Sequence, residues 1–195
     1  MLCYLLNTID TTLEYHQPKT DEINLRIECD ASYNAFSMFC TMIFMNDCLI
    51  HVDVTRNKSE SITDTVTLTS SVHAEMGAAY IAAKNAVSGY KIISPYIRIK
   101  LPIMLMNDAK SALFNLENLV TNKRTMHLDV KYRYVTELVN KGFITLLHKG
   151  TKELLADFGT KALVPAKFIL IVEKILCLIY SDKKLSDKIT VTLRK

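Results

Sequence analysis

The chain has 195 residues, of which 49% are hydrophobic and 23% charged, and its formal net charge is +4. This length suits one well-packed globular domain, and so small a positive charge by itself barely favours a nucleic-acid partner. The five cysteines form no C-x-x-C pair and have no histidine at zinc-ligand spacing, which argues against zinc and indicates free thiols in a reducing compartment.

The first half of the chain predicts three strands in an antiparallel meander. In the first strand Leu25, Ile27 and Cys29 alternate with polar side chains, which is the period of a half-buried strand, and Asp30 ends it. A hairpin turn at Asn46-Asp47 joins the second strand to the third. The expected strands are residues 24–30, 35–45 and 48–54.

The second half alternates helices with strands. Ser70 or Ser71 caps its first helix, Ser88-Gly89 ends that helix, and Lys141-Gly142 stops a later one. A meander followed by such alternation predicts a mixed α/β sheet with helices packed against it. We expect helices at residues 71–87, 109–116, 127–140 and 152–160, and strands at 96–107 and 143–147.

An apolar stretch near the end of the sequence, residues 163–180, is interrupted by Lys167, Glu173 and Lys174. A membrane span needs about 20 mostly apolar residues, so we expect a buried or partner-facing helix here and no membrane partner. The N-terminus has no basic stretch followed by an apolar run, so we expect no secretory signal.

Four carboxylates are placed where this architecture can bring them together. Asp30 ends the first strand, and Asp108 ends the fourth, which is its neighbour if the sheet is ordered 3-2-1-4-5. Glu75 lies on the first long helix and Asp157 on the last. Carboxylates so crowded repel one another unless cations neutralise them. Two Mg²⁺ ions, with Mn²⁺ as a substitute, suit oxygen ligands and can hold both the attacking water and the leaving oxygen of a phosphodiester.

A simpler interpretation of the same acids stays open at this point. The chain has 20 acidic residues, and any four can be solvated surface groups. In that interpretation Asp108 is a helix N-cap, and Glu75 is a charge in the first turn of a helix, where the dipole favours it.

Six short segments resemble, in order, motifs of the ribonuclease H domain of copia/Ty-type retrotransposon polyproteins. The most specific is L-A-D-F-G-T-K-A-L at residues 155–163, which is similar to the A-D-x-x-T-K-x-L signature that closes that domain. The other segments are 4–8 (similar to Y-L-x-x-T), 29–32 (S-D-A-S), 70–76 (S-S-T-E-A-E-Y), 107–112 (D-N-x-S-A) and 124–130 (R-T-K-H-I-D-I). Together the matches span roughly residues 4 to 168.

The resemblance implies a fold and an organisation of the chain. The fold is α/β and ribonuclease H-like, a five-stranded mixed sheet of order 3-2-1-4-5 flanked by helices. The implied domain covers residues 21–165, after a linker from a reverse-transcriptase-like region at 1–20 and before a C-terminal helix and basic tail at 166–195.

The resemblance also implies an activity, which is endonucleolytic hydrolysis of RNA in RNA–DNA hybrids during reverse transcription, with two Mg²⁺ ions. It makes Asp30, Glu75, Asp108 and Asp157 the catalytic and metal-binding residues. The implied partners are the hybrid and the reverse transcriptase domain of the same polyprotein. The implied location is a cytoplasmic virus-like particle, with the nucleus as the alternative, and the oligomeric state is not indicated.

Several departures from the family pattern leave other functions open. None removes a metal ligand, but together they are typical of a divergent element or of an inactive relic that only binds nucleic acid or protein. An integrase core is a third alternative, although it places its glutamate last and Glu75 comes early. The departures are the absence of Trp, an altered S-K-x-Q patch at residues 56–60, and His73, Met126, Arg133 and Ala162 in place of Glu, Lys, His and Pro.

His148 follows the fifth strand and precedes Asp157 by nine residues. Cellular ribonucleases H carry a mobile histidine in a comparable loop, so the resemblance implies a part in product release or proton transfer, for which imidazole is suited near neutral pH. The alternative is an exposed loop histidine without a function.

Candidate contacts to nucleic acid lie in two places. The resemblance implies that groups near Ser32 and Glu75 read the 2′-hydroxyl of RNA across the minor groove of the hybrid. Residues 122–134 mix cations with aromatic side chains, as a surface that follows phosphates does, although a solvated helix face would look the same. The cations of this run are Lys123, Arg124, His127, Lys131 and Arg133, of which His127 has a structural alternative at the start of a helix.

Overall fold

The computed structural model describes residues 22–33, 38–56, 71–118 and 126–175, and the chain divides into two compact units. One unit, Pro18–Lys161, contains the sheet and the helices packed on it, and the other includes the described segment from Ala162 to Ile175. The expected linker at residues 1–20 lies outside the described residues, so the proposed division into domains stays a prediction.

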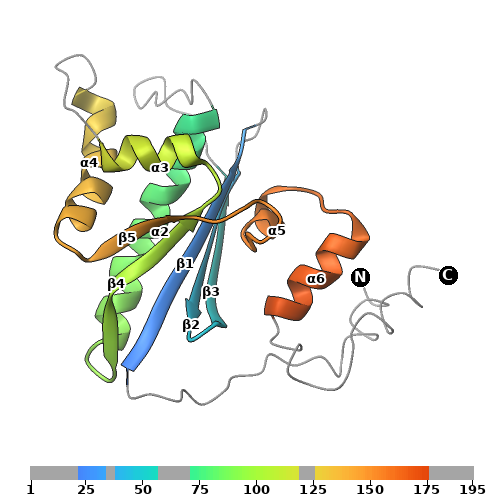
Figure 1. The fold of residues 1–195 in the computed structure, drawn as a ribbon, viewed down its shortest axis with the longest axis horizontal. Coiled ribbons are helices and arrows are strands. Elements are labelled where there is room, and N and C mark those ends of the chain that lie inside the picture. Colours follow the sequence, from blue (N-terminus) through green and yellow to red (C-terminus); the bar gives the residue numbers. More distant parts are fainter. Residues whose placement is uncertain (1–21, 34–37, 57–70, 119–125, 176–195) are drawn as a thin grey trace. The chain divides into compact units, whose positions relative to one another are not determined.

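A five-stranded mixed sheet of order β3-β2-β1-β4-β5 forms the centre of the larger unit (Figure 1). β1 pairs antiparallel with β2 and β2 with β3, whereas β4 is parallel to both β1 and β5. This order and these directions confirm the predicted ribonuclease H-like α/β fold class. The strands are β1 (Glu22–Ser32), β2 (Met38–Met45), β3 (Cys48–Arg56), β4 (Arg98–Asn107) and β5 (Ile144–His148).

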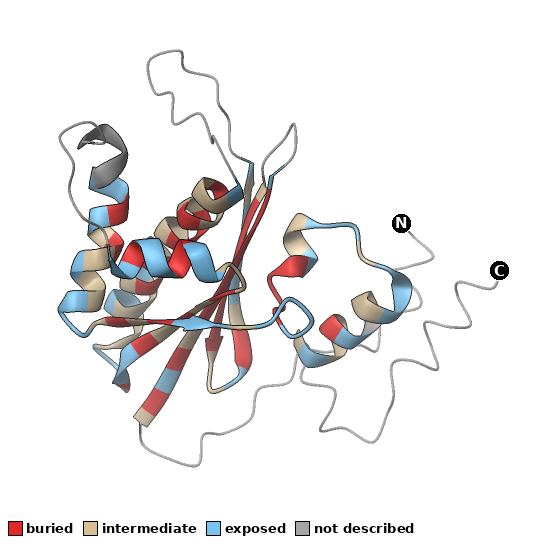
Figure 2. Ribbon diagram, turned by 45° about the horizontal axis from the view of Figure 1, so that its top comes forward, coloured by how far each residue is buried: buried red, intermediate tan, exposed pale blue. Residues whose placement is uncertain are grey.

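Helices cover both faces of this sheet (Figures 1 and 2). Three of them, α2, α3 and α4, lie on one face, and the short α5 lies on the other, against β1 and β2. The described helices are α2 (Ser71–Ile93), α3 (Lys110–Glu117), α4 (Met126–Asn140), α5 (Asp157–Thr160) and, in the second unit, α6 (Pro165–Ile175).

The alternation predicted for β1 decides which side chains face which layer. Leu25, Ile27 and Cys29 belong to the core under α2, α3 and α4, where α2 contributes a row of alanines. Such small side chains let the helix approach the sheet closely, and the burial of apolar surface stabilises the contact. Between and after them, Glu28 and Asp30 point to the side of α5 and are fully buried there.

The predicted hairpin turn at Asn46-Asp47 is confirmed. Both residues have left-handed backbones, with φ of 48° and 68°, the conformation that matches a two-residue turn to the twist of its strands. The Asn46 side chain accepts a hydrogen bond from the backbone N–H of Asn24 at 2.9 Å, which links the turn to β1.

The predicted end of α2 at Ser88-Gly89 is wrong, because the helix continues to Ile93. Glycine inside a helix costs only about 1 kcal/mol. Tyr90 and Ile93 pack against the core, and the Tyr90 ring lies edge-on to Phe143 at 5.1 Å. Burial of these side chains offsets the cost of the glycine.

The last predicted helix, 152–160, is also wrong, since only Asp157–Thr160 is helical. Three consecutive residues, Leu154, Leu155 and Ala156, are all buried, which a helix with a single buried stripe cannot achieve. The backbone N–H of Leu155 donates to Glu28 and not to a helical carbonyl.

The predicted apolar segment at 163–180 begins as α6, of which Ile171 is buried while Leu170 is exposed. Among the helices of the described residues, none is both long and apolar enough to cross a membrane. The described cysteines, Cys29, Cys40 and Cys48, are buried and form no disulfide with one another.

Candidate active site

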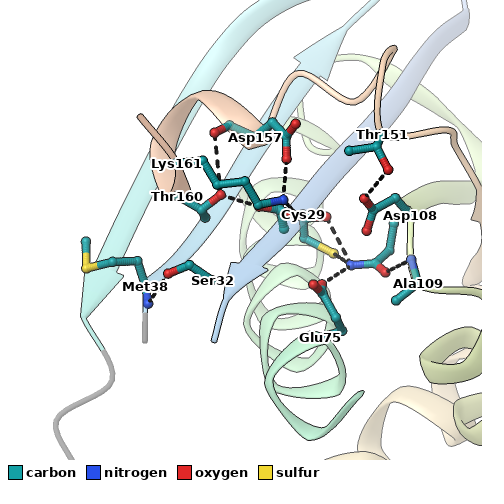
Figure 3. A network of polar contacts seen from close by, with 12 residues as sticks. Cys29, Ser32, Met38, Glu75, Asp108, Ala109, Thr151, Asp157, Thr160 and Lys161 are labelled. Carbon is teal, nitrogen blue, oxygen red and sulfur yellow. Dashed lines mark hydrogen bonds and ion pairs between the residues drawn. The ribbon is translucent and has the colours of Figure 1, made fainter. Parts of the chain in front are cut away.

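Three of the four predicted carboxylates converge at one end of the sheet, and Figure 3 labels two of them, Asp108 and Asp157. Asp30, Asp108 and Asp157 each offer an oxygen, and these oxygens lie within 4.8 Å of one another. Asp30 and Asp157 are buried and Asp108 is half-buried. Such a group of carboxylates could hold a metal ion.

Strand pairing explains why Asp30 and Asp108 meet. β1 and β4 are parallel, and their register pairs Glu28 with Met106. Two residues beyond that pair along each strand lie Asp30 and Asp108. The side-chain period of a strand therefore delivers both to the same end of the sheet.

Asp157 reaches the same place because α5 lies very close to the sheet. Gly159 permits this approach, since a Cβ at that position would be 2.5 Å from Cys40 Sγ and 3.0 Å from Val54 Cγ2. A side chain at this position of the A-D-x-x-T-K-x-L match would therefore clash with the sheet, which explains why the residue is glycine.

Glu75 lies beside the cluster and does not belong to it. Its Oε2 accepts a hydrogen bond from Asn107 Nδ2 at 2.9 Å. Burial, together with the charges of Asp30 and Asp108, raises the pKa of Glu75 to about 7, against the hydrogen bond from Asn107 and the charge of Lys161. The predicted fourth acid is thus close enough to interact electrostatically with Asp30 and Asp108.

Both simpler interpretations of these acids fail. The first turn of α2 contains no acidic residue, so Glu75 is not a first-turn charge. The N-cap of α3 is Ala109, so Asp108 is not a helix N-cap.

Asn107 is fully buried and holds three elements together. Its Nδ2 donates to the Cys29 carbonyl at 3.1 Å and to Glu75, and its Oδ1 accepts from the backbone N–H of Ala109 at 2.7 Å. One amide thus connects β1, α2 and the start of α3. No motif predicted this role, because the family pattern drew attention to Asp108.

Lys161 and Thr160, two residues of the T-K pair after Asp157, contact the acids directly. The Lys161 ammonium lies 2.6 Å from Asp157 Oδ1 and 3.4 Å from Asp30 Oδ1, and the Thr160 hydroxyl donates to Asp30 Oδ2. Burial raises the pKa of Asp30, while Thr160 and Lys161 oppose that rise. The A-D-x-x-T-K-x-L match includes Thr160 and Lys161, but it did not predict their contacts with the acids.

Thr151 and His148 hold Asp108 from the side of β5. The Thr151 hydroxyl donates to Asp108 Oδ2 at 2.7 Å. His148, the last residue of β5 and exposed, has its Nε2 3.1 Å from the Asp108 backbone carbonyl, which can only accept. Nε2 therefore carries the proton in this contact. The sequence predicted His148 and missed Thr151.

The predicted nucleic-acid contacts are only partly described. Ser32 is buried, and its hydroxyl accepts from the backbone N–H of Met38 at 3.0 Å, which is a structural contact between β1 and β2. On α4, Lys131 and Arg133 are exposed and line a surface pocket with Tyr80 and Tyr134. Lys123, Arg124 and the side chain of His127 lie outside the described residues.

Fold and site together define an α/β protein with a carboxylate cluster where two parallel strands of a ribonuclease H-like sheet end. No protein-family model matches the chain. Its sheet and helices are similar to those of several solved ribonucleases H.

Three of these structures illustrate the similarity. The N-terminal ribonuclease H domain of a Mycobacterium tuberculosis protein is 12% identical, with 77% of this chain and 97% of that one covered and a TM-score of 0.49. Ribonuclease H1 of Halobacterium salinarum is 13% identical, with 68% and 90% covered and a TM-score of 0.47. LC11 ribonuclease H1 in complex with an RNA/DNA hybrid is 9% identical, with 67% and 88% covered and a TM-score of 0.49. At such identities the function of this chain depends on its own residues.

Proposed function

We propose that this chain is the ribonuclease H domain of a copia/Ty-type retrotransposon polyprotein and hydrolyses the RNA strand of RNA–DNA hybrids. The observation that carries the proposal is the convergence of Asp30, Asp108 and Asp157 within 4.8 Å. Asp30 lies near the end of β1, Asp108 directly follows the parallel strand β4, and Asp157 begins α5. The segments that resemble the family supply these three acids and Glu75 in the family's order.

The donor set of the cluster fits a divalent cation. All its ligand atoms are carboxylate oxygens, which hard cations such as Mg²⁺ prefer, and two of the three acids are buried. Asp30, Asp108 and Asp157 would hold the metal, with Glu75 adjacent on α2. When bound, two Mg²⁺ ions would polarise the phosphodiester and generate the attacking hydroxide at neutral pH.

The remaining residues of the site orient the acids. Thr151 fixes one oxygen of Asp108, Thr160 fixes one oxygen of Asp30, and Asn107 fixes Glu75. Carboxylates held in this way need little rearrangement when they bind a cation, which favours catalysis.

His148 has a position suited to proton exchange near Asp108. Because its Nε2–H is engaged by the Asp108 carbonyl, Nδ1 is the nitrogen that can take a proton from solvent or product. The residue is exposed, so the imidazole has access to both.

The substrate contacts and the setting of the enzyme follow from the same family. The exposed Lys131 and Arg133 would follow phosphates, together with Lys123, Arg124 and His127. Ser32, near the end of β1, would lie close to the 2′-hydroxyl that distinguishes RNA. The domain would act behind a reverse transcriptase in a cytoplasmic virus-like particle or in the nucleus.

The alternative is an inactive relic that binds the hybrid without cutting it. The departures from the family pattern favour this alternative, whereas the convergence of the acids favours activity. The two alternatives make opposite predictions for cleavage and the same prediction for binding.

Cleavage of a labelled RNA–DNA hybrid in Mg²⁺, and then in Mn²⁺, tests the proposal. The full chain is compared with Asp108→Asn, and with Glu117→Gln as a control that removes an exposed acid from α3. We expect metal-dependent loss of the RNA strand with the wild type and the control, and none with Asp108→Asn. Binding of the hybrid without cleavage by any of the three proteins would support the relic.

A further inference from the structure

Lys161 places a positive charge inside the acidic cluster. Its Nζ lies 2.6 Å from Asp157 Oδ1 and 3.4 Å from Asp30 Oδ1, so the ammonium bridges two of the three clustered carboxylates (Figure 3). Both carboxylates are almost fully buried, at 1% and 0% exposure of their side chains, whereas the lysine side chain is 41% exposed.

The charges explain why an ammonium is held there. Asp30 and Asp157 are buried next to Asp108, and carboxylates in such proximity need a counter-charge to remain ionised. The ammonium is therefore well suited to neutralise part of the cluster.

The same oxygens cannot serve a lysine and a metal ion together. A cation coordinated by Asp30 and Asp157 would lie within a few ångströms of the ammonium, and like charges so close repel strongly. The lysine side chain is flexible and reaches the cluster from the protein surface, so it can turn towards water without displacement of the backbone.

We propose that Lys161 is the resident counter-ion of the metal-free site and exchanges with a divalent cation. In the absence of metal its ammonium holds Asp30 and Asp157 together, and when metal binds the side chain moves into solvent. This inference rests on the proposed function only in that the site must bind a divalent cation. It makes Lys161 a positioning residue that lowers the metal affinity while it preserves the geometry of the acids.

Removal of the ammonium should then have two opposite effects. In EDTA, Lys161→Met leaves buried carboxylates without their counter-charge, so the melting temperature falls. In Mn²⁺ the cation no longer competes with the lysine, so Mn²⁺ binds more tightly, by on the order of tenfold, which corresponds to 1.4 kcal/mol. A residue that merely supported the fold would weaken metal binding and could not strengthen it.

The experiment measures the dissociation constant of Mn²⁺ by electron paramagnetic resonance and the melting temperature in EDTA, with the full chain. Lys152→Met is the matched control, because it removes the same charge from the exposed segment that leads to α5. Lys161→Arg keeps the charge and should retain weak metal binding.

The outcomes separate this inference from the proposed function. Tighter Mn²⁺ binding and a lower metal-free melting temperature, in Lys161→Met alone, support the exchange. Equal dissociation constants in the wild type and Lys161→Met, or equal gains in Lys152→Met, overturn the exchange and leave the metal site intact. Absence of Mn²⁺ binding in all these proteins overturns both the exchange and the proposed metal-dependent activity.

Discussion

The backbone N–H of Leu155 donates a hydrogen bond to Glu28 Oε2 at 2.6 Å, across 127 residues of sequence. The other oxygen of this fully buried carboxylate lies 2.7 Å from Lys149 Nζ and also contacts Arg26. Since Leu155 precedes Asp157 by two residues, Glu28 fixes the start of α5 and with it the third acid of the site. Glu28 and Asp30 therefore lie on the same face of β1. Asp30 is one of the three acids, and Glu28 positions Asp157 through the start of α5.

Substitution of Glu28 should therefore lower the stability of the fold. In Glu28→Gln the amide keeps one oxygen acceptor but loses the negative charge between Lys149 and Arg26. We expect the free energy of unfolding to fall by about 1–3 kcal/mol, the usual cost of a buried polar group left without its partner. Urea denaturation measures it, with Glu137→Gln as control, since the Glu137–Lys141 pair is exposed and should contribute less than about 1 kcal/mol. Equal effects of the two changes would contradict the anchoring role of Glu28.

Gly159 should not tolerate a methyl group. In Gly159→Ala the new Cβ would lie 2.5 Å from Cys40 Sγ and 2.8 Å from Cys40 Cβ, which forces α5 away from the sheet. We expect a loss of about 1–3 kcal/mol in the free energy of unfolding, as for other overpacked sites, and weaker metal binding because Asp157 moves with α5. Gly150→Ala is the control, since a Cβ there meets nothing within 4 Å. Retention of wild-type stability and metal affinity by Gly159→Ala would show that the contact between α5 and Cys40 can accommodate a methyl group.

The Glu75 carboxyl should make the metal-free protein less stable as the pH rises. Its pKa rises from an ordinary 4.5 to about 7 in the folded protein, so between these values the folded state holds a proton that the unfolded chain has released. Stability falls with rising pH wherever the folded state binds more protons. In EDTA, the melting temperature should fall less steeply over this pH range in Glu75→Gln than in the wild type. Identical slopes in the two proteins would mean that Glu75 ionises normally.

Asn107 should not be replaceable by aspartate, although the two side chains have the same shape. Asn107→Asp turns the donor aimed at Glu75 and at the Cys29 carbonyl into an acceptor. We expect a loss of about 1–3 kcal/mol near pH 5, and a larger loss near about pH 8, where two adjacent carboxylates are ionised. Thermal denaturation at the two pH values measures this, against Asn118→Asp at the exposed end of α3. A loss that does not grow with pH would argue against direct contact between residues 75 and 107.

Much of the fold could be predicted because hydrophobic and polar residues alternate along β1 with the period of two that a half-buried strand requires. Leu25, Ile27 and Cys29 alternate with polar residues, and the structure uses that alternation to separate the two faces of β1. The alternation of helices and strands in the second half predicted only a mixed sheet, whereas the strand order was implied by the family resemblance. The prediction that α2 ends at Gly89 was wrong, because burial of Tyr90 and Ile93 outweighs the tendency of glycine to end a helix.

The site was predictable only where a residue type carries the chemistry. Asp30, Asp108 and Asp157 were predicted because carboxylates bind metal, and the structure brings them together. Asn107 and Thr151 were missed because an amide and a hydroxyl are ordinary residues until tertiary contacts decide what they orient. The helix predicted from residue 152 is wrong for a similar reason. No local pattern indicates that the backbone N–H of Leu155 donates to Glu28 instead of to a helical carbonyl.

The order of the strands along the chain also sets the order in which the site can be assembled during synthesis. β1, β2 and β3 are consecutive and antiparallel, so this meander can form from local contacts. The pairing of β1 with β4, and then the packing of α5 on β1, can form only after those later segments have been synthesised. A chain still emerging from the ribosome thus holds Asp30 long before Asp157. The carboxylate cluster is therefore incomplete until α5, the last element of the sheet unit, has left the ribosome.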